Sequence, residues 1–169
     1  MSTEGIEAVR IYLDEQGADY ELVEHEERFT AAAEAQAAGV EPGDAAKDLI
    51  LRDGESYVMA VIPASERLDL GKARGMLEAG KSLRLATEEE IGRDFERFEV
   101  GAIPPFGPLH RIPQIVDRRL LEHDRVLGSA GDHAHGVLVE PNEMVRITKA
   151  RVGDLCLGFD DLDKARASG

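Results

Sequence analysis

The chain has 169 residues with a formal net charge of -14, and 43% of its residues are hydrophobic. This length suits one domain, residues 1–169, whose interior must be filled by aliphatic side chains because Trp is absent. The acidic balance argues against a broad surface for polyanions, so nucleic acid would need a local basic site or a partner that holds it. The single cysteine excludes an internal disulfide and a cysteine-rich zinc module. Because no apolar run is long enough for a leader or a membrane span, we expect a cytoplasmic protein with no membrane partner.

The first half of the chain carries alternating helix and strand signals. Apolar residues at helical spacing mark the first helix, and Thr30 and Gly39 are suited to begin and end the second. The Asp53-Gly54 pair between two apolar runs predicts a hairpin turn. In order, we predict a helix over residues 2–17, a strand over 19–25, a helix over 30–40 and a hairpin over 46–64.

The second half adds short strands with helices between them. Thr87 and Glu90 have the spacing of a capping box, which predicts a helix start. We predict helices over residues 69–80, 87–95 and 141–148, strands over 81–86, 111–117, 125–128 and 135–141, a mixed segment over 150–159 and a polar, fraying tail over about 160–169. The fold class is therefore α+β, with a mixed and mainly antiparallel sheet curled into a barrel-like core. Strict alternation of strand and helix is missing, so a Rossmann fold is not expected.

Residues 98–110, "FEVGAIPPFGPLH", predict a stiff apolar loop. Pro104 and Pro105 have no amide hydrogens and a fixed φ, which disfavours a helix or a central strand. Gly101 and Gly107 allow the backbone to approach a ligand closely. Two interpretations stay open from the residues alone. The loop is either a rigid connector whose Phe106 fills the core, or a preformed cradle for a ligand.

Other candidate sites are weaker. The dinucleotide-binding, P-loop, zinc-protease and nucleophile-elbow motifs are absent from the sequence. Cys156 between two leucines is interpreted as a buried small hydrophobe. His133 and His135 would share one face of a strand and could meet a metal, although spacing identifies no third ligand, so a polar site contact or a surface pair is the alternative. Lys47 before an apolar run is ordinarily solvated, and "GSAG" at 128–131 is either a turn or an anion-binding run of amides.

Several segments together resemble a known family. "TAAAEAQAAGV", "AAKDLIL", "VMAVIPASERLDL", "GAIPPFG" and "IVDRRLL" occur in the order typical of the YbaK/prolyl-tRNA-synthetase-associated domain, over about residues 20–152. The resemblance implies the fold of that family and an aminoacyl-tRNA deacylase, a hydrolase that corrects mischarged tRNA. The implied substrate is tRNA(Pro) carrying Ala, Cys or a similar small amino acid, because a synthetase pocket cannot reject such residues by binding alone. The implied partners are the 3′ end of aminoacyl-tRNA and a synthetase, with no DNA, no metal and no cofactor.

The resemblance also implies roles for residues of this chain. Lys47 would contact the terminal phosphate or the ester, and the amides of the loop would hold the aminoacyl carbonyl. The family's histidine would be His135 or, with a small shift, His133, and Thr30 would line the amino-acid pocket. The implied site consists of Lys47, Gly101 and His135 as catalytic residues, with Thr30, Ala102, Ile103, Pro104, Pro105, Phe106, Gly107, Gly128 and His133 binding the substrate.

The family's chemistry needs no nucleophilic side chain, since the 2′-hydroxyl of the terminal adenosine helps to activate water. The alternatives are a non-catalytic module of the same fold that binds an amino acid or a nucleotide, and a metal-dependent hydrolase using the two histidines. The residues leave open which amino acid is removed and what the oligomeric state is.

Overall fold

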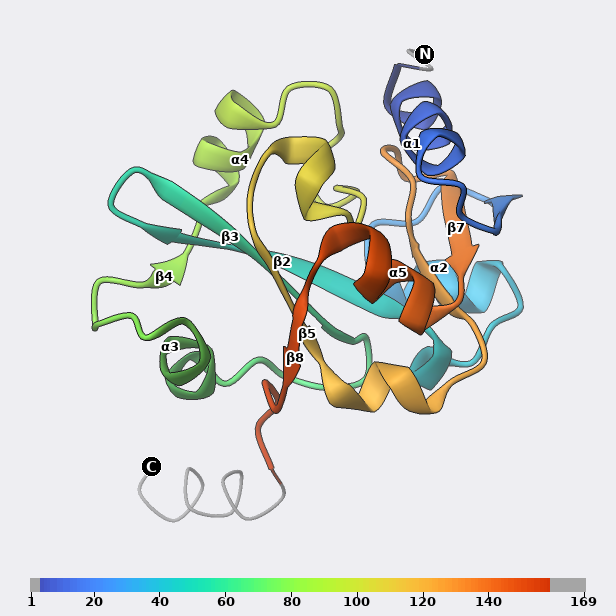
Figure 1. The fold of residues 1–169 in the computed structure, drawn as a ribbon. Coiled ribbons are helices and arrows are strands. Elements are labelled where there is room, and N and C mark those ends of the chain that lie inside the picture. Colours follow the sequence, from blue (N-terminus) through green and yellow to red (C-terminus); the bar gives the residue numbers. More distant parts are fainter. Residues whose placement is uncertain (1–3, 159–169) are drawn as a thin grey trace.

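The structure, a computed structural model, describes residues 4–158 (Figure 1). The α-helices in this range are α1 (Glu4–Glu15), α2 (Ala31–Ala37), α3 (Leu70–Leu77), α4 (Glu88–Asp94) and α5 (Pro141–Thr148), and 3-10 helices span Pro42–Asp44, Gly107–His110 and Arg118–Glu122. All five predicted helices are confirmed, including the Thr30 cap of α2 and the capping box at the start of α4. None of these helices has the length and apolar character needed to cross a membrane. The predicted polar tail lies outside the described residues.

The strands form two sheets. They are β1 (Tyr20–Glu24), β2 (Ala46–Asp53), β3 (Ser56–Pro63), β4 (Arg84–Leu85), β5 (Gln114–Asp117), β6 (Val126–Ser129), β7 (His135–Val139) and β8 (Arg151–Gly153). One sheet has three strands in the order β1-β7-β6, and the other has five in the order β4-β2-β3-β5-β8. Among the strand pairings of residues 4–158, only β3–β5 and β5–β8 are parallel, which confirms the mixed, mainly antiparallel α+β class.

No closed ring of strands joins the two sheets in the described part of the chain, so the barrel-like core stays a prediction. An isolated parallel bridge between Ala45 and Leu127 connects the start of β2 to β6. Strand β4 pairs with β2 only at Leu51 and Arg52. Between these two points, residues 47–49 have no partner strand on the outer side of β2 within the described range. We call residues 47–49 the open edge of β2.

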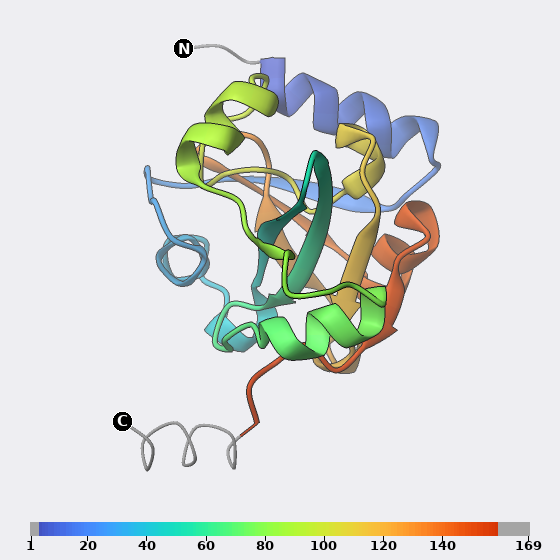
Figure 2. The same ribbon diagram turned by 90° about the vertical axis from the view of Figure 1, so that its left-hand side faces the viewer.

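The core lies on both faces of the five-stranded sheet, because successive strand residues point to opposite faces. In β3, Met59 and Val61 face the larger cluster, which includes side chains of α1 and of the three-stranded sheet. Ala60 and Ile62 face a smaller cluster that includes α3. Helices α1 and α3 accordingly lie at opposite ends of the molecule (Figures 1 and 2). Cys156 is fully buried in the smaller cluster, and burial raises the pKa of its thiol to about 12, which confirms its predicted structural role.

Three local predictions need correction. The loop expected over residues 98–110 ends in a 3-10 helix, Gly107–His110, which begins after the two adjacent prolines and tolerates Pro108 in its first turn. Gly128 lies inside β6, which agrees with the predicted strand over residues 125–128 and makes the turn interpretation of residues 128–131 wrong for this residue. His133 lies in the turn before β7, so it does not share a strand face with His135.

Candidate functional site

The proline-rich loop is held from beneath by a buried glutamine. Gln114, the first residue of β5, accepts a hydrogen bond from the amide of Gly107 at 2.5 Å and donates one to the carbonyl of Pro105 at 3.0 Å. The ring of His110 lies 3.1 Å from the carbonyl of Pro104, measured at Nε2. Burial lowers the pKa of His110 to about 4, so the neutral ring donates its Nε2 hydrogen to that carbonyl. The backbone after the two prolines is therefore fixed before any ligand binds.

The start of the loop is tied to the turn between β6 and β7. The amide of Glu99 donates a hydrogen bond to the carbonyl of Gly131 at 3.0 Å, and the amide of Gly131 donates one to the carbonyl of Ala102 at 3.0 Å. Gly101 lies between these anchors with a φ of 87°, a conformation that residues with a side chain rarely adopt. A glycine is therefore required at the exposed corner of the loop.

Few amides of residues 101–105 are left for a ligand. The amide of Ala102 donates to the carbonyl of Glu99 at 2.9 Å, and the two prolines have no N–H. Within the described residues, no acceptor is found for the amides of Gly101 and Ile103. A substrate carbonyl that binds this loop through its backbone would therefore have these two donors to use.

Gly101 and Ile103 line a cavity of about 250 Å³ between the loop, β2, β4 and the start of α4. Figure 2 presents this side of the molecule, with α4 and the β2–β3 hairpin toward the viewer. The rest of the wall comes from Asp48, Leu49, Ile50, Leu85, Ala86, Glu88, Ile91 and Val100. A wider groove of about 550 Å³ lies beyond α4, but none of the predicted site residues lines it. The smaller cavity is therefore the candidate binding site.

Asp48 is a site residue that the sequence reasoning missed. It leaves β2 on the face of the larger core cluster, opposite Val61, and its Oδ2 atom is inaccessible and without a hydrogen-bond partner in the described residues. Burial, and to a smaller extent the carboxylate of Glu34, raise the pKa of Asp48 to about 8, so the group is largely neutral at pH 7. The available signal was a single acid directly before the apolar run of residues 49–51.

Lys47, the neighbour of Asp48, points to the other face of β2. It pairs with Ile62, a residue of the smaller core cluster, and burial lowers the pKa of its ammonium. The groups charged at neutral pH that act on it are Arg67 and Glu66, and neither lines the cavity. The structure therefore does not bring Lys47 into the cavity with Gly101, although both border the open edge of β2.

The two histidines have different surroundings. The ring of His133 packs against Phe29 with centroids 4.6 Å apart, and its Cε1 lies 3.3 Å from where a Cβ on Gly101 would be. The Nδ1 of His135 instead lies 2.8 Å from a carboxylate oxygen of Asp132. Within residues 4–158 there is no group of three or more His, Cys, Asp or Glu side chains that could hold a metal ion. Of the two, His133 is the one beside the loop.

The remaining predicted residues have evident structural roles. Thr30 Oγ1 accepts the amide of Ala33 at 3.1 Å and lines a separate groove along α2. Gly128 makes room for the loop, because a Cβ there would lie 2.6 Å from Cγ of Pro105. Phe106 is fully buried against Tyr12, with centroids 5.7 Å apart, which favours the interpretation of this residue as a core residue.

A second buried acid lies close to Asp48. Glu34 of α2 is 5% exposed, and its Oε2 lies 3.0 Å from Nε2 of His25. His25 donates its Nδ1 hydrogen to the carbonyl of Glu26 at 2.7 Å. The hydrogen bond between His25 Nε2 and Glu34 Oε2 therefore needs one further proton, carried by either group. Burial raises the pKa of Glu34 to about 7. A glutamate in an alanine-rich helix gave no sign of this burial, which depends on how α2 packs.

Comparison with known proteins agrees with the fold and the loop. A family model described as the aminoacyl-tRNA editing domain matches residues 25–147. The prolyl-tRNA editing protein ProX of Acetoanaerobium sticklandii is 26% identical over 157 residues, covering 89% of this chain and 94% of that protein. The multifunctional Ser/Thr-tRNA deacylase ProXp-y of Escherichia coli K12 is 27% identical over 142 residues, covering 81% of this chain and 84% of that protein. A solved structure of a candidate trans-editing enzyme for prolyl-tRNA synthetase is 30% identical, with a TM-score of 0.81, and covers 94% of this chain and 99% of that one.

The fold and its loop therefore define a hydrolase of the tRNA-editing class, as the sequence predicts. The chain belongs to the aminoacyl-tRNA editing domain family, whose model covers the loop, Asp48 and both histidines of the turn before β7. The resemblance and the enzyme class predicted from the sequence, an aminoacyl-tRNA deacylase, are confirmed by this match and by the relatives. The roles of individual residues stay predictions.

Proposed function

We propose that this chain hydrolyses the ester bond of mischarged aminoacyl-tRNA in trans, on tRNA(Pro) carrying Ala or Cys or on a tRNA carrying a similar small amino acid. The observation that supports this most directly is that Gly101 and Ile103, whose amides have no acceptor within the described residues, both line a cavity of about 250 Å³. A cavity of this size suits a small aminoacyl group, since drug-sized ligands occupy about 300–1,000 Å³. The relatives named as prolyl-tRNA editing and Ser/Thr-tRNA deacylase proteins give further support.

The chemistry proposed for the loop is charge stabilisation. The two amides bind the ester carbonyl oxygen and become stronger partners as it gains negative charge during attack by water. A water oxygen bonds to the carbonyl carbon, the bond to the ribose oxygen breaks, and the ribose oxygen takes the proton, with the 2′-hydroxyl of the terminal adenosine helping to activate the water. Because Gln114 and His110 already fix the loop, little ordering of the protein remains at that moment.

The proposed role of Lys47 is to bind a phosphate of the terminal nucleotides. Lys47 and Asp48 leave the open edge of β2 on opposite faces, so a strand of tRNA that crosses this edge has its aminoacyl group in the cavity and a phosphate beside Lys47. The partial burial that lowers the pKa of Lys47 also reduces solvent screening of the contact. His133 is the better placed of the two histidines to contact the substrate, because it borders Gly101.

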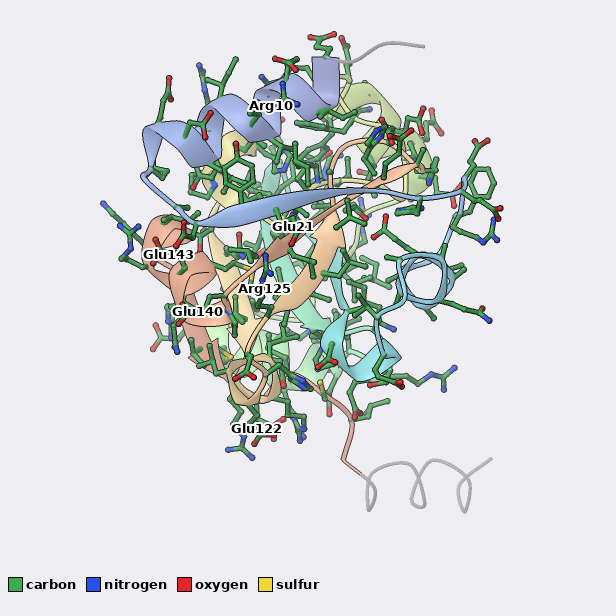
Figure 3. The ribbon with its side chains drawn as sticks, turned by 90° about the vertical axis from the view of Figure 1, so that its right-hand side faces the viewer. Arg10, Glu21, Glu122, Arg125, Glu140 and Glu143 are labelled. Atoms are coloured by element: carbon green, nitrogen blue, oxygen red, sulfur yellow. The ribbon has the colours of Figure 1, made fainter. Side chains whose placement is uncertain are left out.

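The acidic surface supports recognition of the aminoacyl end rather than of the whole tRNA. Figure 3 shows the side opposite that of Figure 2, where Glu21, Glu122, Glu140 and Glu143 are drawn. The two arginines labelled there are already paired, Arg10 with Glu7 at 2.6 Å and Arg125 with Glu21 at 3.3 Å. We therefore propose that a synthetase or another carrier holds the rest of the tRNA. Tight filter binding of deacylated tRNA by the isolated protein at physiological salt would refute this part of the proposal.

The test is a deacylation screen over tRNAs charged with different amino acids, with Lys47→Ala and Gly101→Ala as variants. Alanine at position 101 must adopt a φ of 87° next to His133, so the loop shifts and kcat/KM falls by about 10- to 100-fold. Gly17→Ala is the matched control, because Gly17 has a φ of 66° and nothing within 4 Å of its Cβ position.

Lys81→Ala is the control for Lys47→Ala, since Lys81 is an exposed lysine outside the cavity. We expect both controls to keep full activity, and Lys47→Ala to raise KM more than it lowers kcat. The proposal fails if no mischarged tRNA is hydrolysed, or if Lys47→Ala and Gly101→Ala both act like wild type. Binding of aminoacyl analogues without hydrolysis would instead identify a non-catalytic module.

A further inference from the structure

The wall of the cavity is apolar apart from two acids, and these differ in exposure. Glu88 is exposed in the first turn of α4, whereas the Oδ2 atom of Asp48 is inaccessible and has no hydrogen-bond partner in the described residues. The apolar part of the wall is formed by Leu49, Ile50, Leu85, Ile91, Val100 and Ile103. Asp48 itself lines the cavity, so a change of its side-chain rotamer would bring the unpartnered Oδ2 to a ligand there.

A buried oxygen without a partner needs an explanation, because buried polar atoms in folded proteins are nearly always paired. The neighbouring strand gives none, since Asp48 is opposite Val61. Glu34 is no partner either, because its negative charge raises the pKa of Asp48 and its Oε2 is already in contact with His25 at 3.0 Å. A group supplied by the ligand would complete the hydrogen bonding of Asp48.

We propose that Asp48 determines the specificity of the cavity by hydrogen-bonding the side-chain hydroxyl of a small aminoacyl group. Seryl and threonyl esters are then hydrolysed in preference to alanyl esters of the same tRNA. The inference rests on the proposed function, because it needs the carbonyl of the substrate at the amides of Gly101 and Ile103. With the carbonyl there, the aminoacyl side chain lies between the loop and β2, where Asp48 forms the wall.

The state of the carboxyl group favours a hydroxyl over the α-ammonium as its partner. Burial raises the pKa of Asp48 to about 8, so at pH 7 it is mostly a neutral acid. A neutral carboxyl group both donates and accepts a hydrogen bond, as a hydroxyl does, while it offers an ammonium group no opposite charge. The surrounding aliphatic side chains would also remove the water that an ammonium group needs.

We expect a measurable preference for seryl over alanyl esters. An unpaired buried polar group is costly, so sites built to hydrogen-bond a hydroxyl discriminate strongly against substrates that lack it. We expect wild-type protein to favour the seryl over the alanyl ester of one tRNA by about 10- to 100-fold in kcat/KM.

The experiment measures kcat/KM for seryl and alanyl esters of the same tRNA with wild type, Asp48→Asn, Asp48→Leu and Glu88→Gln. Leucine has the same branched arrangement of heavy atoms but makes no hydrogen bond, so Asp48→Leu should lose the seryl preference while keeping or raising the alanyl rate. Asparagine keeps one donor and one acceptor, so Asp48→Asn should retain most of the preference. Glu88→Gln is the matched control, because it changes the other acid of the same wall and should leave the seryl-to-alanyl ratio unchanged.

A binding measurement separates this inference from the proposed function. Calorimetry with 3′-amide analogues of seryl- and alanyl-adenosine reports the preference without hydrolysis, and circular dichroism confirms that each variant is folded. If the analogues bind with a seryl preference that Asp48→Leu abolishes but no ester is hydrolysed, the proposed function fails and Asp48 still sets specificity. If wild type shows no seryl preference, or if Asp48→Leu lowers both rates equally, the proposal for Asp48 is overturned.

Discussion

The proline-rich loop depends on one side chain that a substitution can remove without changing the loop itself. Gln114 is 4% exposed and makes hydrogen bonds at 2.5 Å and 3.0 Å to the backbone of Gly107 and Pro105. In Gln114→Met the volume is nearly kept, but the amide of Gly107 and the carbonyl of Pro105 lose their partners. Each buried group left unpaired costs about 1–3 kcal/mol, so the free energy of unfolding should fall by about 2–6 kcal/mol.

The assay is urea unfolding followed by circular dichroism, together with thermal melting. For a domain of this length the expected loss corresponds to a decrease in Tm of roughly 4–24 °C. Gln36→Met in α2 is the control, because the side chain of Gln36 lines an open groove and should change stability by less than about 0.5 kcal/mol. The loop should also shift, so kcat/KM should fall further than the unfolded fraction accounts for.

A second variant tests the reasoning through pH. Gln114→Glu keeps an acceptor for the amide of Gly107, but its ionised form turns an acceptor toward the carbonyl of Pro105 and buries a charge. Its pKa should therefore be raised in the folded state, so its stability should decrease as the pH rises above about 4.3, the ordinary value for glutamate. If Gln114→Met costs less than about 0.5 kcal/mol, or if Gln114→Glu is as stable as wild type at pH 8, Gln114 does not hold the loop.

The other predictions concern packing, titration and reactivity. Gly128→Ala should lower stability by about 1–3 kcal/mol in denaturant unfolding, because the added Cβ would lie 2.6 Å from Cγ of Pro105. Gly75→Ala is the control: nothing lies within 4 Å of its Cβ position, so the substitution should stabilise the helix by about 0.5–1 kcal/mol. Equal effects of the two substitutions would contradict this packing. The pKa of Asp48 is raised to about 8 in the folded protein, so between about pH 4 and pH 8 the native state keeps a proton that the unfolded state loses. The contribution of Asp48 to stability should therefore fall as the pH rises through this range. Asp48→Asn should remove that slope from a plot of unfolding free energy against pH. Cys156, with a pKa of about 12 and no exposure, should react with a thiol reagent only at the rate of unfolding, and fast labelling of the native protein would be the opposite result.

Local chemistry made most of the elements predictable. The turn at Asp53 and Gly54, the cap at Thr30 and the capping box of α4 each depend on residues within four positions of one another, and all three are confirmed. The parallel pairings of β5 could not be predicted in this way. They join segments more than 30 residues apart, and short strands carry no mark of which neighbour they will take.

The site was predictable in part for the same reason. Pro104, Pro105 and Gly101 mark a rigid loop through their own backbone preferences, so the loop could be identified from the sequence alone. Gln114 and Asp48 look like ordinary polar residues of strands, and their importance comes from burial, which only the packed structure determines. The hypothesis that His133 and His135 share a strand face is wrong because alternation over a few residues does not distinguish a strand end from a turn.

Under the proposed function, the order of Lys47 and Asp48 accounts for recognition of tRNA by a strongly acidic chain. Adjacent strand residues point to opposite faces, so the cation and the buried acid of this pair act on different parts of one ligand. The open edge of β2 is where a ligand can reach both faces, because no strand covers residues 47–49 on that side within the described range. In that proposal, only the last nucleotide of a tRNA has to cross this edge for its phosphate to meet Lys47 and its aminoacyl group to meet Asp48. One cation at the edge then suffices locally, and the net charge of -14 repels mainly the parts of the tRNA that the domain does not need to hold.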